Sequence, residues 1–127
     1  MAIIFCEEVW NRGITGTTTV YSASELNSLL AQAEKYYVSV HTSQPAGTAP
    51  KITLKLERSN DGATWDTQTP LTMINAVDYS ATTDIYAQDT GASRVGGCFC
   101  RVTITLSATS GTPSGHFRII LTGRDDV

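Results

Sequence analysis

Two segments of the chain alternate strictly between apolar and polar residues. Every second residue is apolar from 52 to 56, and the same is true from 98 to 106. A period of two places the apolar side chains of a strand on one face of a sheet. Each segment therefore predicts a strand with one buried face, formed by Ile52, Leu54 and Leu56 in the first and by Cys98, Cys100, Val102, Ile104 and Leu106 in the second.

Less regular patterns of apolar and β-branched residues predict further strands. Segments rich in glycine, proline and small polar residues separate them and predict loops, the longest at 44–50, 88–97 and 108–115. Seven to nine short strands with turn-rich connections are typical of an antiparallel β-sandwich, with either a jelly-roll or an immunoglobulin-like topology. The additional strands are expected at 2–10, 15–21, 36–43, 66–72, 74–79, 84–87 and 116–123.

The segment 22–34 is the one place where a helix competes with a strand. Ser22 and Glu25 have the spacing of a capping box. A short helix is predicted here because four apolar residues follow at helical spacing. The alternative is an extended strand from Val20 through Leu30 and then a turn. The apolar residues are Leu26, Leu29, Leu30 and Ala33.

A polar turn follows the strand that begins at Lys51. It consists of Ser59, Asn60, Asp61 and Gly62. Ser, Asn and Asp side chains can hydrogen-bond to the nearby backbone, and glycine can adopt positive φ, as a tight reversal requires. Trp65 comes just after the turn. Our main interpretation is that this ring folds back over one end of the core, because a bulky residue after a hairpin commonly covers the apolar ends of its strands.

Candidate catalytic and metal-binding residues form no recognisable constellation. His41 and His116 both fall on the polar side of their strands, and neither has a nearby nucleophile motif. Asp61 and Asp66 flank a glycine turn, but two carboxylates are too few for a calcium loop. We therefore predict no catalytic site, no metal site and no cofactor.

Exposed aromatic residues offer a different kind of site. Trp65, Tyr79 and Tyr86 could together stack on a sugar ring, because aromatic faces bind the apolar faces of ligands. This gives an alternative function, a carbohydrate-binding or adhesin-type sandwich module.

Composition and charge narrow the classes of partner. At 127 residues the chain fits a single domain, 1–127, with a hydrophobic core. A net charge of −3, with scattered Lys and Arg, argues against nucleic acid as the primary partner. The chain begins with a short apolar run that no basic residue precedes and that two glutamates follow at once, so we expect no signal peptide. Because no segment approaches the roughly 20 apolar residues of a membrane span, we expect no such span and a cytoplasmic or virion location.

Three cysteines leave one thiol without a partner. Cys98 and Cys100 lie side by side on one strand face, where they cannot bridge each other. Reduced, buried thiols are the main expectation, and a bridge from Cys6 to Cys98 or Cys100 stays open.

A longer pattern resembles a known group of proteins. It consists of L-x-L-E-x-S-x-D-G-x-x-W from Leu54 to Trp65, R-V-T-I-T from Arg101 to Thr105, and T-G-R at 122–124. This pattern, over about half of the chain, resembles small β-sandwich structural proteins of tailed phages and prophages, such as head decoration, cement and tail accessory proteins. The S-x-D-G-x-x-W part also occurs in sugar-binding sandwich modules. The resemblance implies a non-enzymatic building block repeated on a particle or filament.

A repeated building block needs surfaces that fit its neighbours. The expected partners are other copies of the chain, as a homo-oligomer, and a capsid or tail protein. Candidate interface residues are apolar side chains that the alternation places on an exposed face or end. The segment from Ile3 to Trp10 could also add a strand to a neighbour's sheet. The candidates are Ile3, Phe5, Trp10, Tyr37 and Ile120.

Overall fold

The structure is a computed structural model that describes residues 2–21, 33, 35–81, 84–88 and 99–125. Within these residues the chain is all-β, and no helix there is long and apolar enough to cross a membrane. The prediction of an antiparallel β-sandwich is confirmed. The strands are β1 (Ala2–Thr15), β2 (Thr19–Tyr21), β3 (Lys35–Thr48), β4 (Lys51–Ser59), β5 (Asp66–Asp78), β6 (Asp84–Gln88), β7 (Phe99–Ser107) and β8 (Ser110–Asp125).

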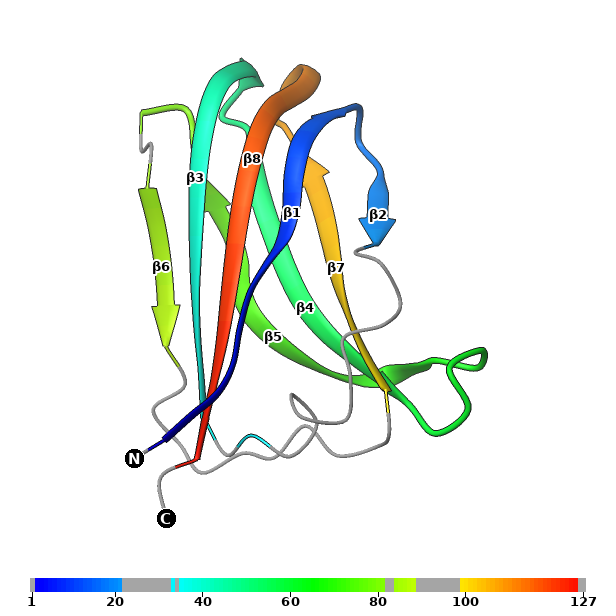
Figure 1. Cartoon of the computed structure of the whole chain (residues 1–127). Coiled ribbons are helices and arrows are strands. Elements are labelled where there is room, and N and C mark those ends of the chain that lie inside the picture. The colour runs from blue at the N-terminus through cyan, green and yellow to red at the C-terminus, as the bar shows by residue number, and fades with distance from the viewer. Residues whose placement is uncertain (1, 22–32, 34, 82–83, 89–98, 126–127) are drawn as a thin grey trace.

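Two four-stranded sheets form the sandwich, in the orders β1-β8-β3-β6 and β2-β7-β4-β5 (Figure 1). Strand β1 pairs with β8, β2 with β7, β3 with β6 and β4 with β5, all antiparallel. The first four strands thus pair with the last four in reverse order, and the pairs alternate between the two sheets. This pairing is that of a jelly roll, and it decides between the two topologies that the sequence left open.

The core lies between the sheets and includes the two strand faces that the alternation predicted, those of β4 and β7. Ile52, Leu54 and Leu56 of β4 are fully buried, and so are Phe117, Ile119 and Leu121 of β8. Full burial of one such side chain stabilises the fold by about 1.5–3 kcal/mol relative to its exposure to water. The sheet that contains β4 also contributes four buried residues of β7, namely Cys100, Val102, Ile104 and Leu106. The sheet that contains β8 also contributes Tyr36, Val38 and Val40 of β3.

Several strands are longer than their local sequence indicated. Strand β1 continues through residues 11–13, β3 runs to Thr48 through the predicted loop at 44–50, and β8 begins at Ser110 within the predicted loop at 108–115. Pairing explains the difference, because β8 lies between β1 and β3 and hydrogen-bonds to both. Bulges in β3 near Ala46 accommodate glycine and proline there. By contrast, the predicted strand 15–21 is interrupted, because Thr15 is the last residue of β1 and only Thr19–Tyr21 form β2.

Parts of two predictions lie outside the described residues. The segment 22–34, predicted as a helix or a strand, is described only at Ala33, which is buried. Cys98 also lies outside them. A bridge between Cys6 and Cys100 is ruled out, because Cys6 is an exposed free thiol on β1 and Cys100 is a free thiol in the core. Burial raises the pKa of Cys100 to about 11.

Tyr79 anchors the connection after β5 to the opposite side of the core. Its side chain is buried, its hydroxyl donates a hydrogen bond to the Ser114 carbonyl at 3.0 Å, and its ring meets Phe117 edge to face. Gly115 leaves room for this pair, because a Cβ there would lie 3.0 Å from the Phe117 ring. The expectation that Tyr79 forms part of an exposed stacking platform is therefore wrong.

Candidate functional site

The residues predicted for interaction surfaces divide between the core and the outer faces of the two sheets. Tyr37 and Ile120 lie on the outer face of the β1-β8-β3-β6 sheet, and Trp65 lies at the outer face of the other sheet. The backbones of Ile3 and Phe5 pair with Arg124 and Gly123 of β8.

Trp10 is buried, contrary to its expected exposure. Glu8 pairs with Ile120 and Trp10 with Ile119, so β1 carries one extra residue, Val9, at this point. This β-bulge places Glu8 outward and Trp10 inward, although strict alternation would place both on one face. The Trp10 indole donates a hydrogen bond to the Arg12 carbonyl at 3.1 Å. A bulge cannot be read from the alternation alone, which explains the error.

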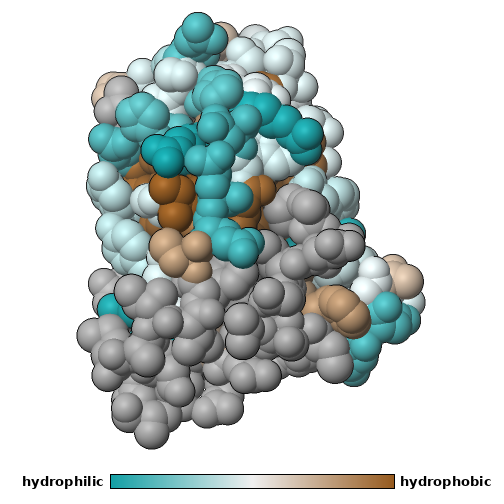
Figure 2. Space-filling model, viewed as in Figure 1, coloured by the Kyte–Doolittle hydropathy of each residue, from teal (hydrophilic) through white to brown (hydrophobic). Residues whose placement is uncertain are grey.

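Tyr37, Tyr86 and Ile120 come from three neighbouring strands and form a patch that we call the tyrosine patch. The rings of Tyr37 on β3 and Tyr86 on β6 stack with their centroids 6.0 Å apart. Tyr86 is 60% exposed, Tyr37 is exposed and Ile120 is half-buried. Tyr86 was predicted to accompany Trp65, but it lies with the interface candidates on the opposite sheet. Figure 2 shows hydrophobic surface in brown between strongly hydrophilic side chains on this side of the molecule.

Charged groups around the tyrosine patch are paired within the chain. Arg118 donates to Glu8 at 2.7 Å, and His41 Nδ1 lies 2.6 Å from Asp84 Oδ1. The hydrogen bond from Arg118 is the main reason that the pKa of Glu8 lies below its usual value. These ionic groups therefore have partners within the chain.

Both histidines lie at the polar outer face, as predicted. His116 Nε2 is 2.8 Å from Asn11 Oδ1, and His41 is paired with Asp84. Ser39 lines the same hollow of about 210 Å³ as His41 and Asp84. Among the described contacts, however, no hydrogen bond joins Ser39 to His41, so the hydroxyl is not activated as a nucleophile in this geometry. In the same residues no group of three or more His, Cys, Asp or Glu could hold a metal ion.

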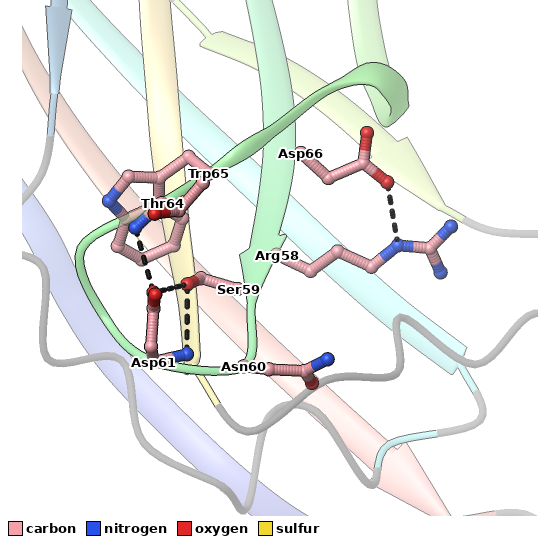
Figure 3. A pocket seen from close by; sticks show the side chains of 7 residues that line it. All are labelled: Arg58, Ser59, Asn60, Asp61, Thr64, Trp65 and Asp66. Carbon is pink, nitrogen blue, oxygen red and sulfur yellow. Dashed lines mark hydrogen bonds and ion pairs between the residues drawn. The ribbon is translucent and has the colours of Figure 1, made fainter.

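The polar turn after β4 is held by its own side chains, as the sequence predicted. The Ser59 hydroxyl donates to Asp61 Oδ1 at 2.9 Å and accepts from the backbone N–H of Gly62 at 3.0 Å. Asp61 Oδ1 also accepts from the backbone N–H of Ala63 at 2.8 Å. It accepts from the backbone N–H of Thr64 at 2.7 Å as well, a bond drawn in Figure 3. These bonds, that of Thr64 foremost, hold the pKa of the Asp61 carboxyl well below its usual value.

Trp65 does not join the buried core, contrary to our main interpretation of the sequence. Its ring is half-buried and lies against Arg101 of β7, whose guanidinium carbon is 4.5 Å from the ring centroid. The same guanidinium lies 4.0 Å from the centre of the Tyr21 ring. Arg101 therefore contacts two aromatic rings, an arrangement that cation–π attraction favours.

Glu57 completes this cluster beneath Arg101. The guanidinium Nε donates to Glu57 Oε1 at 2.8 Å, and the two side chains are only 17% and 9% exposed. Glu57 lies on the outer side of β4, where Arg101 shields it from water. Sequence analysis missed Tyr21, Arg101 and Glu57 as a group, because their proximity depends on the register of β4 against β7.

A groove of about 470 Å³ opens beside this cluster. Arg58 and Asp66 form one side of it and make a long ion pair of 3.4 Å across the first rung of the β4–β5 pairing. The other lining residues are Ser59, Asn60, Asp61, Thr64 and Trp65 (Figure 3).

Comparison with known proteins finds similarity only at the level of structure. No family model matches the chain, and no curated protein matches it in sequence. A chain in the structure of the infectious bursal disease virus Gt strain superposes with a TM-score of 0.59 and 10% identity, over 94% of this chain and 31% of that one. A chain in the structure of the Gx strain gives a TM-score of 0.48 and 12% identity, over 93% and 28%. This chain thus spans less than a third of the viral chains, and its similarity to the first shows that the fold is shared.

Proposed function

We propose that the chain is a non-enzymatic structural protein of a virus particle that associates with copies of itself. The observation that carries the proposal is the jelly-roll likeness to a chain of a virus structure, which extends over 94% of this chain. Jelly-roll sandwiches are common in viral capsids, although also in lectins, so the fold alone does not assign a function. The absence of a catalytic or metal constellation among the described residues is compatible with a structural role.

The outer face of the β1-β8-β3-β6 sheet is the surface that we assign to self-association. Its twelve registered β1–β8 pairs and its strand spacing give an area of roughly 700 Å². A stable interface buries about 800 Å² on each partner, so this face is of suitable size. The tyrosine patch supplies apolar and aromatic contact near its middle, as interface cores commonly have.

Charge supports the same choice of surface. The charges of Glu8 and Arg118 compensate each other within the chain, and Asp84 is hydrogen-bonded to His41, so an identical copy does not need to supply partners for them. Polar pairs at the margin of an interface fix its orientation more than they strengthen it. The finer assignment, a decoration, cement or tail accessory protein of a tailed phage with a capsid or tail partner, is part of this proposal and rests on the sequence resemblance alone.

Light scattering coupled to size exclusion tests the proposal directly. The wild-type chain should show a mass above 13.6 kDa that rises with concentration, and electron microscopy should show regular assemblies. Tyr86→Glu should lower this mass, because it places an unpaired charge in the tyrosine patch. The matched control is Val77→Glu, at an exposed apolar residue on β5 of the other sheet, and it should assemble as wild type does.

Two results would overturn the proposal. A monodisperse monomer at every concentration, without assemblies in the microscope, would remove self-association. Assembly that persists in Tyr86→Glu but is lost in Val77→Glu would move the interface to the opposite sheet.

A further inference from the structure

We propose that the groove beside Trp65 binds a neutral saccharide. This function goes beyond the structural role and does not depend on it, because the groove lies beside the β4–β5 turn of the β2-β7-β4-β5 sheet, whereas the tyrosine patch belongs to the other sheet. Its volume of about 470 Å³ is within the usual range of small-molecule sites. One aromatic ring and six polar or charged residues line it, which is the mixture that a ligand with both apolar and hydroxyl faces requires.

Trp65 provides the apolar surface for such a ligand. The Arg101 guanidinium lies over one face of the indole and is itself fixed by Glu57. Figure 3 shows the indole at the side of the groove, with the β7 ribbon behind it. The ring is therefore held in place from behind, and its half-exposed surface is available to the C–H face of a sugar.

The turn that forms the floor of the groove is organised before any ligand arrives. Ser59 and Asp61 hold it through five hydrogen bonds with lengths from 2.7 to 3.2 Å. A binding site that is already ordered loses little conformational entropy when it binds. The Asn60 side chain takes no part in these bonds and is exposed, so its amide can both donate to and accept from sugar hydroxyls.

Charges in the groove select against acidic ligands. Arg58 lies 3.4 Å from Asp66, so its charge is largely balanced, and Asp61 adds a second carboxylate whose pKa is lowered. The groove thus carries a small negative charge. Sulfated or uronic-acid sugars would be repelled, whereas neutral hydroxyls can bond to the carboxylates and the guanidinium.

Titration calorimetry of the full chain with cellobiose, lactose, maltose and di-N-acetylchitobiose tests the inference, with heparin disaccharide as the anionic probe. At least one neutral disaccharide should bind at millimolar concentration, and the heparin disaccharide should not. Trp65→Ala and Asn60→Ala should each weaken that binding by roughly tenfold or more. Asn60→Ala keeps the hydrogen bonds of the turn, so it still tests the site if Trp65→Ala unfolds the protein.

Tyr86→Ala is the matched control, because it removes an exposed aromatic residue from the opposite sheet and should leave sugar binding unchanged. Binding of none of the four neutral disaccharides would overturn the inference. Equal binding by wild type and Asn60→Ala, or loss in Tyr86→Ala alone, would also overturn it. Light scattering of the same samples reports on assembly separately, so failure of one proposal can be told from failure of the other.

Discussion

The outer faces of the two sheets carry the same kind of ion pair in different surroundings. Arg118 and Glu8 on the β1-β8-β3-β6 sheet are 54% and 38% exposed. Arg101 and Glu57 on the other sheet are 17% and 9% exposed, and two aromatic rings cover the guanidinium. The N···O distances differ by only 0.1 Å, at 2.7 and 2.8 Å. We therefore expect burial, more than contact distance, to determine how much the stability of the fold depends on each pair.

The largest expected effect comes from removal of Arg101. Arg101→Ala removes the ion pair with Glu57 and both ring contacts, together with the apolar stem that covers this part of the sheet, so we expect a loss of about 2–3 kcal/mol in the free energy of unfolding. Arg118→Ala is the control and should cost about 0–1 kcal/mol, because water solvates the remaining Glu8. Urea denaturation of both variants measures the difference. Equal losses would show that burial does not separate the two pairs.

Tyr79→Phe tests whether a buried hydrogen bond between uncharged groups also contributes to the free energy of unfolding, as we expect of the buried ion pair. The variant keeps the ring against Phe117 and removes only the hydroxyl that donates to the Ser114 carbonyl. Loss of a buried hydrogen bond that leaves a carbonyl unpaired should cost about 1–2 kcal/mol. Thermal unfolding followed by circular dichroism measures it, and an unchanged melting temperature would contradict the assignment of this bond.

Thr42→Val tests a buried hydroxyl that, unlike that of Tyr79, has no hydrogen-bond partner among the described residues. The Thr42 side chain is buried in β3, and none of the described residues forms a hydrogen bond with its hydroxyl. Replacement by an apolar group of the same shape should raise the free energy of unfolding by about 0.5–1 kcal/mol, because the desolvation cost disappears. Urea denaturation measures the change, and the control variant is Thr72→Val, at an exposed threonine on β5. A destabilised Thr42→Val protein would mean that the hydroxyl has a partner.

The smallest expected effect concerns Asp61 and depends on pH. Its folded pKa is depressed, first by the backbone N–H of Thr64, so its contribution to stability is fully present above the unfolded pKa of about 4 and is lost as the pH falls toward the folded value. Asp61→Asn should therefore be slightly less stable than wild type at neutral pH, and the difference should shrink below about pH 4. Melting temperatures across this range measure it, and a difference that grows in acid would contradict the sign.

Sequence alternation predicted strands and their buried faces well where the apolar residues of a strand recur at every second position. The apolar sets of β4 and β7 that the structure describes lie in the core, and the Ser59–Gly62 turn lies where its side chains indicated. The errors at Trp10, Tyr79 and Trp65 have a common origin. A bulge decided the exposure of Trp10, contacts with Ser114 and Phe117 of β8 decided that of Tyr79, and a guanidinium from β7 lies against Trp65. None of these is a local property of the sequence.

The candidate sites were less accessible to prediction than the fold. Tyr37 and Ile120 were placed correctly on an outer face, but Tyr86 was assigned to Trp65 although β6 joins the other sheet. Glu57 and Arg101 are 44 residues apart, and Glu8 and Arg118 are 110 apart. Such pairs become visible only when the register is known.

The sequence by itself determined that this protein is an antiparallel sandwich, which faces of its strands are buried, and where the Ser59–Gly62 turn reverses the chain, because a period of two and turn-forming side chains act over a few residues. Only the tertiary structure decided the jelly-roll order, the length of β1, β3 and β8, and the two outer surfaces. A strand takes its hydrogen-bond partners from distant parts of the chain, and that choice sets which side chains meet on each face.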